Sequence, residues 1–294
     1  MSVLLEREQA QAPPRAAAST LREFSRHRLG LTGLTLIVLI ALFCFLGPLI
    51  DPTNQTQVNI AITNLGPSGG HLLGTDDNGF DILGRLMIGG RDSLEIGLAV
   101  AVLATFLGVV WGAVAGFTGG ALDALMMRIV DVFLALPAIF VLIYLATVIT
   151  PTVPMLIIVI SLLSWLGPAR LIRGETLSLK TREFVESARS MGAGRTRIIF
   201  RHLIPNTIGT IVVNATFQVA DAIIILATLS FLGFGLAPPA ATWGGMLSSG
   251  TTYLLDGYWW EVYPVGIMIM LTVISFNLVG DALRSAIDVR LRED

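Results

Sequence analysis

The chain has 294 residues, of which 54% are hydrophobic and 14% are charged, and its mean hydropathy is +0.76. A soluble domain could not hold so apolar a composition in water, so the protein is integral to a membrane. The net charge of -2, with basic residues dispersed between apolar runs, excludes a nucleic-acid-binding face. The single cysteine, Cys44, lies inside an apolar run and excludes both a disulfide framework and a cysteine-based metal site.

Six apolar runs reach the length of about 20 residues that a helix needs to cross a hydrocarbon core. They are residues 31–50, 94–115, 125–149, 153–172, 208–231 and 263–282. The first run has no small-residue cleavage site before Pro48, so we expect it to remain as an anchor. We therefore predict an all-α fold with six transmembrane helices.

The same runs divide the chain into segments. We expect a first transmembrane helix at 31–50, an external loop at 51–92 and a five-helix core at 93–283. The core includes a polar loop at 174–206 and a second external loop at 234–262. Two tails, 1–30 and 284–294, flank these segments.

The distribution of lysine and arginine predicts the orientation. All but two of the 19 basic residues lie in the two tails, in residues 170–206 or in the 116–128 turn, and only Arg85 and Arg91 lie on the opposite side. Basic residues favour the cytoplasmic flank of a span, so both termini are expected in the cytoplasm. Aromatic residues of the last outer loop are expected to mark the outer membrane interface: Trp243, Tyr253, Tyr258, Trp259, Trp260 and Tyr263.

The first external loop is rich in carboxylates. Asp76, Asp77, Asn78 and Asp81 suggest calcium, but Asp81 stands where an EF-hand loop requires glycine. His71 is a single imidazole, which makes no metal site. We predict no metal in this chain, and we expect this loop and the 234–262 loop to receive an external protein.

Polar side chains inside the spans are candidates for a solute pathway, because a charge at a helix centre costs about 2.5–3.5 kcal/mol unless it faces protein or water. For each residue singly, hydrogen bonding between helices is the favoured interpretation. Three of them share a face at i, i+4 and i+7, and as a stripe they favour a pathway lining. The candidates are Asn214, Gln218 and Asp221 in that stripe, with Asp131 and Asn277.

Small residues and prolines in the spans have a structural interpretation. Glycines recur every four positions at 108, 112, 116 and 120, a spacing that predicts close helix packing. Pro137 and Pro168 each remove a backbone hydrogen bond and are expected to kink the third and fourth spans.

The polar loop predicts two short helices. Phe184, Ala188 and Met191 fall on one helical face, and the glycines at 192 and 194 then end that helix. A second helix is expected from Arg195 to Leu203, stopped before Pro205. A charge run alone would favour a solvated interfacial hairpin instead.

The spacing inside this loop resembles the coupling loop of ATP-binding-cassette (ABC) importer permeases. The matching residues are Glu186, Ala188, the glycine four positions later at Gly192 and the proline thirteen positions after that at Pro205. Ser187 replaces the usual middle alanine, and His202 and Ile204 replace isoleucine and leucine.

The resemblance extends over residues 22–292 and is to the C-type permease subunit of dipeptide, oligopeptide and nickel importers. Phe80 departs from it, because the family usually has arginine at this position, in a Gly-Arg-Asp triplet. The segments that carry the likeness are 71–76, Arg85, 90–94, 229–235, Pro238-Pro239, 243–247 and 280–284.

This resemblance implies a type I ABC importer permease fold in a bacterial inner membrane. It implies a homologous permease partner, two ATPase subunits and an external substrate-binding protein, with ATP and Mg bound by the ATPases. The residues it assigns to ATPase coupling are Glu186, Ser187, Ala188, Met191, Gly192 and Pro205. It leaves dipeptides, oligopeptides, nickel chelates and glutathione open as solutes.

The residues themselves exclude a nucleotide site of the P-loop type, because the only lysine, Lys180, follows Leu179 rather than glycine. No enzyme constellation is visible either, since His27, His71 and His202 lie in different segments. The alternative function is an ion-coupled secondary transporter that uses Asp131 and Asp221. That alternative leaves the polar loop unexplained, and the two halves of the chain show no repeat.

Overall fold

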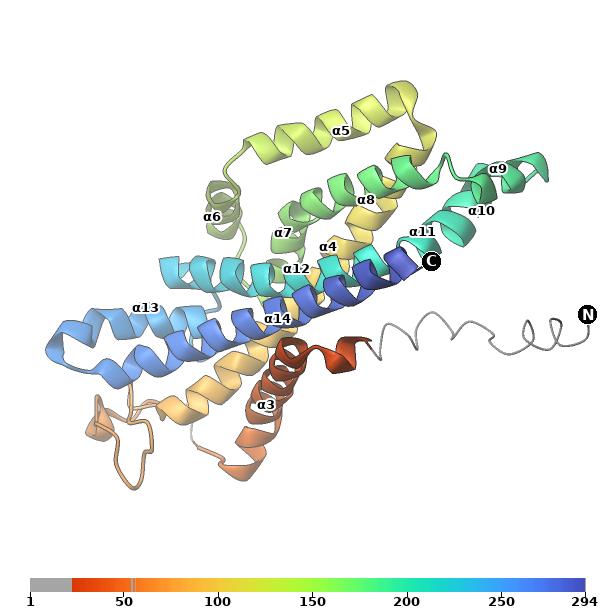
Figure 1. Cartoon of the computed structure of the whole chain (residues 1–294). Coiled ribbons are helices and arrows are strands. Elements are labelled where there is room, and N and C mark those ends of the chain that lie inside the picture. The colour runs from red at the N-terminus through yellow and green to blue at the C-terminus, as the bar shows by residue number, and fades with distance from the viewer. Residues whose placement is uncertain (1–22, 54, 56, 294) are drawn as a thin grey trace, which may run out of the picture.

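The computed structural model describes residues 23–53, 55 and 57–293, and within these residues the chain forms helices joined by turns, with one isolated β-bridge between Thr75 and Asp81. Figure 1 shows an elongated bundle. Helices α9 to α11 lie at the same end as the C-terminal end of α14. Helix α13 and the segment between α3 and α4 lie at the opposite end. We call these the knob end and the loop end.

The six predicted spans correspond to four continuous helices and two bent pairs. Helices α3 (Arg28–Ile50), α4 (Ile82–Thr118), α12 (Ile208–Leu229) with η3 (Ser230–Phe234), and α14 (Tyr263–Glu293) are each long and apolar enough to cross a membrane. The bent pairs are α5 (Gly120–Ala135) with α6 (Ala138–Val148), and α7 (Val153–Ser164) with α8 (Leu166–Leu179). The predicted all-α membrane fold is confirmed.

Both predicted proline kinks lie beside breaks in these pairs. Pro137 is the N-cap of α6, and the chain turns by 82° between α5 and α6. The third predicted span is therefore two helices rather than one straight crossing. The second break, of 43°, falls at Trp165, three residues before Pro168. Because Pro168 has no N–H, the carbonyl of Ser164 loses its helical donor at this bend.

Helix α4 is the centre of the bundle and contacts α3, α7, α8 and α12. The predicted glycine stripe explains its approach to α8. A Cβ at Gly108 would lie 2.9 Å from the carbonyl oxygen of Trp165, and one at Gly112 would lie 2.9 Å from the backbone nitrogen of Arg173. Gly116 meets α8 in the same way, so three of the four glycines serve helix packing. Gly120 does not, because it is the first residue of α5, with φ +62° and open space around it among the described residues.

The loop end is fixed by polar contacts to the start of α4. The Oδ1 atom of Asp81 accepts from the Gly84 N–H at 2.9 Å and caps α4, while its Oδ2 lies 2.8 Å from the Nδ1 of His71. Helix α4 therefore begins inside the predicted 51–92 loop. Trp260 donates from Nε1 to the carbonyl of Thr75 at 3.3 Å, which joins the two outer segments.

Trp243 corrects one prediction about the outer interface. It begins α13 (Trp243–Tyr253) and is fully buried, with its Nε1 donating to the carbonyl of Leu86 at 3.0 Å. The residue anchors α13 on α4 rather than lying at headgroup depth. Trp259 and Tyr263 are exposed, as expected of an interfacial belt.

Candidate functional site

The polar loop folds into a compact unit of short helices, which we call the knob and define as residues 183–206. It contains α9 (Glu183–Ser190), α10 (Arg195–Ile198), the π-turn η2 (Ile199–Leu203) and α11 (Ile204–Asn206). Gly192 ends α9 with φ +80°, a left-handed conformation that glycine adopts without cost. The Ala193 N–H donates to the Ala188 carbonyl at 3.0 Å and the Gly192 N–H to the Arg189 carbonyl at 2.9 Å, which together form a Schellman C-cap.

The side of α9 that meets the bundle contains only one of the three residues on the predicted helical face, Ala188. Val185 and Ala188 are buried in a cluster with Phe117 of α4 and with Ile198 and Leu203 of the knob. Phe184 and Met191, the other two residues of the predicted helical face, are exposed, and Met191 is 80% exposed. An eight-residue helix with apolar residues on two sides does not reveal from spacing which side meets the bundle. The structure assigns the inner side to Val185 and Ala188.

The second limb of the knob also differs from prediction. The helix does not stop before Pro205 but widens into a π-turn, in which the Ile204 N–H donates to the Ile199 carbonyl five residues back. It then continues to Asn206, whose side-chain nitrogen donates to the carbonyl of His202 at 2.5 Å. The wider turn lets the helix continue through Pro205, which has no N–H to donate.

The predicted coupling residues thus divide between the inside and the outside of the knob. Glu186, Ser187 and Gly192 are exposed with Met191, and Pro205 is exposed on the second limb. Ala188 is only 2% exposed and supports the helix from within. Beside α9 lies a groove of about 380 Å³, where the Arg189 guanidinium stands 5.2 Å from the centre of the Phe117 ring.

Two polar contacts that the sequence did not suggest join the knob end to the spans. The Nζ of Lys180, just before the knob, donates to the carbonyl of Gly116 in α4 at 3.0 Å. About two turns further into the bundle, Arg173 of α8 holds the carboxylate of Asp123 in α5 through two hydrogen bonds of 2.6 and 2.8 Å. The part of the chain that leads into the knob is therefore joined to α4, and α8 is joined to α5. Pairing of Arg173 with Asp123, 50 positions away in the sequence, left no local signal.

The candidate pathway residues do not form one uniform stripe. Gln218 is buried, and its Nε2 donates to the carbonyl of Ser164 at 2.8 Å, the acceptor that Pro168 leaves free. Asn214 is half-buried, and its Oδ1 is buried with no hydrogen-bond partner in the described part of the chain. Asp221 is exposed on the surface of the chain.

The two remaining candidates lie elsewhere. Asp131 of α5 forms an ion pair with Arg170 of α8, and both side chains are about half exposed. Asn277 is half-buried in α14. The structure thus pairs Asp131 with a residue of α8. It places Asn277 on α14 and the other three candidates on α12.

Comparison with protein families gives two matches. A family described as "Binding-protein-dependent transport system inner membrane component" matches residues 108–293, which include the knob. A second, described as "N-terminal TM domain of oligopeptide transport permease C", matches residues 17–67. Together they cover both ends of the described structure.

Similar proteins extend over nearly the whole chain. The dipeptide transport system permease protein DppC of Bacillus subtilis is 36% identical over 271 residues, which are 92% of this chain and 85% of the relative. The oligopeptide transport system permease protein OppC of the same organism is 39% identical over 270 residues, 92% of this chain and 88% of the relative.

Among solved structures, a chain of the MetNI methionine ABC transporter in an inward-facing conformation aligns with a TM-score of 0.57. The sequences are 19% identical, and the alignment covers 69% of this chain and 96% of that chain. The likeness is one of fold.

Proposed function

The chain belongs to the binding-protein-dependent transport system inner membrane components, the permease subunits of ABC importers, and from this membership we propose that it forms half of a peptide-conducting pathway. Its partner would be a homologous permease. Two ATPase subunits would bind the knob end and an external binding protein the loop end. ATP hydrolysis belongs to the partner subunits, since this family is the non-enzymatic transmembrane component.

The assignment of peptides as solute rests on the two Bacillus subtilis relatives, whose names give dipeptide and oligopeptide transport. The orientation follows from the basic residues: the knob end would face the cytoplasm, with both termini inside. Asp131, Asn214, Gln218, Asp221 and Asn277 remain candidates for the pathway. Asp221 is the strongest of them for contact with solute, because its carboxylate is exposed and Gln218 is engaged with Ser164.

The proposed coupling role rests on one observation: the knob has a buried side and an exposed side. Its inner side is buried on the ends of α4 and α8, while Glu186, Ser187 and Met191 are exposed on its outer side. An exposed apolar side chain such as Met191, 80% exposed beside a groove, suits a protein interface. We propose Glu186, Ser187, Met191 and Gly192 as the surface that meets the ATPase, with Ala188 and Pro205 shaping it.

The test uses the assembled transporter in proteoliposomes and measures ATP hydrolysis stimulated by the loaded binding protein. Met191→Glu should reduce the stimulation at least tenfold, because it puts a charge into the apolar part of the interface. Thr181→Glu, at an exposed position just before the knob, is the matched control and should retain it. Equal stimulation in both variants would exclude the knob as the ATPase contact.

A second pair of variants tests the shape of the knob. Gly192→Val forces a β-branched residue into a left-handed conformation, at a cost of about 1–2 kcal/mol, and should also uncouple ATP hydrolysis. Gly192→Asn tolerates this conformation and should retain most of the stimulation. If the two variants behave alike, the turn at Gly192 has no part in coupling.

A further inference from the structure

The loop end contains a cavity that the coupling role does not use. We call it the outer pocket. Its volume is about 340 Å³, and it lies between the segment before α4 and the helix α13. The residues that matter below are Asp76, Asp77, Phe80, Arg85, Met246 and Glu261.

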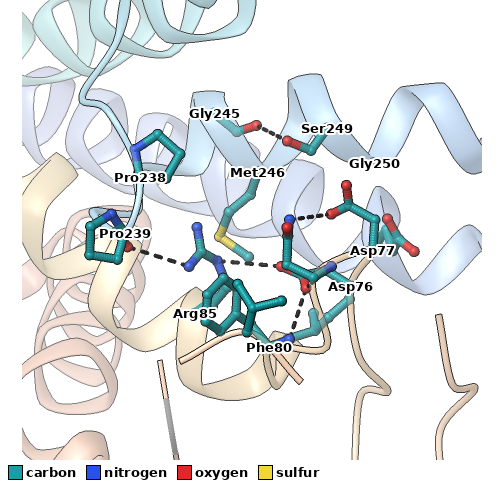
Figure 2. Close-up of a pocket in the computed structure, with 14 residues that line it drawn as sticks. Asp76, Asp77, Phe80, Arg85, Pro238, Pro239, Gly245, Met246, Ser249 and Gly250 are labelled. Atoms are coloured by element: carbon teal, nitrogen blue, oxygen red, sulfur yellow. Dashed lines mark hydrogen bonds and ion pairs between the residues drawn. The ribbon is translucent and has the colours of Figure 1, made fainter. Parts of the chain in front are cut away.

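The charges on the wall of the outer pocket do not balance. Among its described lining residues there are three carboxylates and a single guanidinium, that of Arg85. Figure 2 shows this guanidinium held between Asp76 and the carbonyl of Pro239. The distances are 3.6 Å from Nε to the Asp76 carboxylate and 3.4 Å from Nη1 to the carbonyl oxygen. Arg85 therefore forms an ion pair with Asp76, and among the described residues neither Asp77 nor Glu261 has an ion pair of its own.

Asp76 and Asp77 are otherwise engaged in the turn they build. The Oδ1 of Asp76 accepts from the backbone N–H groups of Asn78 and Phe80 at 3.0 and 2.9 Å, and Asp77 accepts from the Asn78 side chain at 2.8 Å. These contacts fix the two carboxylates in place on one wall of the pocket. Burial is the main cause that raises the pKa of Asp76, and Arg85 opposes the shift.

Glu261 differs from the two aspartates in its hydrogen bonding. It is only 3% exposed, it lines the outer pocket, and neither of its carboxylate oxygens has a hydrogen-bond partner among the described residues. Its backbone is pressed against α13, since a Cβ at Gly250 would lie 2.8 Å from the Glu261 carbonyl oxygen. Burial, followed by the charges of Asp77 and Asp76, raises the pKa of Glu261 to about 8. Glu261 therefore keeps its proton at neutral pH, and a cation that enters the pocket would stabilise the carboxylate and release this proton.

The chemistry of the pocket favours an organic cation over a metal ion. No group of three or more His, Cys, Asp or Glu side chains in the described part of the chain is placed to hold a metal. The wall also includes the ring of Phe80 and the thioether of Met246. Such apolar surface suits the aliphatic stem of a lysine, whose ammonium carries three donors for the carboxylates.

We propose that the outer pocket receives a lysine side chain of the external binding protein, whose ammonium group binds Glu261 and the neighbouring aspartates. The proposal rests on the proposed function, in which the binding protein docks at the loop end. The attraction between the ammonium and the carboxylates would stabilise the docked complex. This contact would form at the loop end, which lies opposite the knob end (Figure 1).

The first test uses n-butylammonium chloride, an analogue of the lysine side chain, with the assembled transporter in nanodiscs. Calorimetric titration should give saturable binding that n-butanol, of equal length but neutral, does not reproduce. Glu261→Gln should weaken this binding at least tenfold. Asp256→Asn removes an exposed carboxylate of the same outer segment that does not line the pocket, and it should bind as the unaltered protein does. Absent binding, or equal binding in Glu261→Gln, would overturn the proposal.

The second test measures the affinity of the binding protein for the same nanodiscs. Glu261→Gln should lower that affinity at least tenfold, Asp256→Asn should not, and n-butylammonium should compete with docking. Phe80→Lys, which brings an ammonium into the pocket wall without removing a carboxylate, should also block both ligands. This variant provides an independent measurement if Glu261→Gln does not assemble.

One outcome would assign the pocket to the solute instead and would overturn the proposal. In that case docking is unchanged in Glu261→Gln, while the preference for peptides with a free amino terminus over N-acetylated peptides is lost. Failure of the proposed function itself looks different: the unaltered complex would then show no ATP hydrolysis stimulated by the binding protein, whatever n-butylammonium does.

Discussion

The bend between α7 and α8 allows a quantitative test of how the bundle is held together. Pro168 removes the N–H that would bind the Ser164 carbonyl, and the Nε2 of Gln218 donates to that oxygen at 2.8 Å from α12. Gln218→Leu should leave a buried carbonyl without a donor. Such a loss costs about 1–3 kcal/mol, and hydrogen bonds between membrane helices contribute about 0.6 kcal/mol on average, so we expect about 1–2 kcal/mol.

A double-mutant cycle isolates this contact from the other effects of the substitution. Pro168→Ala restores an N–H at position 168, which can donate to Ser164 as in an unbroken helix. In that background Gln218→Leu should cost less than about 0.5 kcal/mol, because the carbonyl no longer needs Gln218. The free energies of unfolding would be measured in mixed micelles by circular dichroism. Thr216→Val is the control and should change little, because the Thr216 hydroxyl donates to the Val212 carbonyl of its own helix.

The refuting result is additivity. If Gln218→Leu costs the same with and without Pro168, the glutamine does not replace the missing helical donor. Gln218 would then return to the residues whose role must be sought in the solute pathway.

Three further predictions concern stability. Gly112→Ala should lower the free energy of unfolding by about 1–3 kcal/mol, because its Cβ would meet the backbone of α8; the same change at Gly174, which has open space, should not. Trp243→Phe should cost about 1–3 kcal/mol by removing the donor to Leu86, and a loss under about 0.3 kcal/mol would contradict that anchor. Glu261 has a pKa raised from 4.5 to about 8, so the folded state keeps a proton that the unfolded state releases. Stability measured in micelles should fall by up to about 5 kcal/mol as the pH rises from about 4.5 to about 8, and Glu261→Gln should remove that slope.

The spans were predictable because the membrane imposes a length and an apolar composition that local sequence must satisfy. The same holds for Pro137 and for Gly192, whose effects on the backbone are local. The family was predictable from the spacing of residues in the polar loop, and the family that matches residues 108–293 includes this loop.

What the sequence did not predict depends on contacts between distant segments. The choice between Val185 and Phe184 as the buried side of α9 is made by Phe117 of α4. Trp243 looked like an interfacial aromatic because its partner, the Leu86 carbonyl, is 157 positions away. Glu261 was not among the residues predicted from the sequence, since only the fold places it beside Asp76 and Asp77.

Peptide uptake into proteoliposomes tests the central claim most directly. Vesicles that contain this chain and its permease partner, with the binding protein outside, would be compared with and without the ATPase subunits and internal ATP. The proposed function predicts uptake only when both are present. Uptake driven by a proton or sodium gradient in vesicles without the ATPases would contradict it and would favour an ion-coupled transporter.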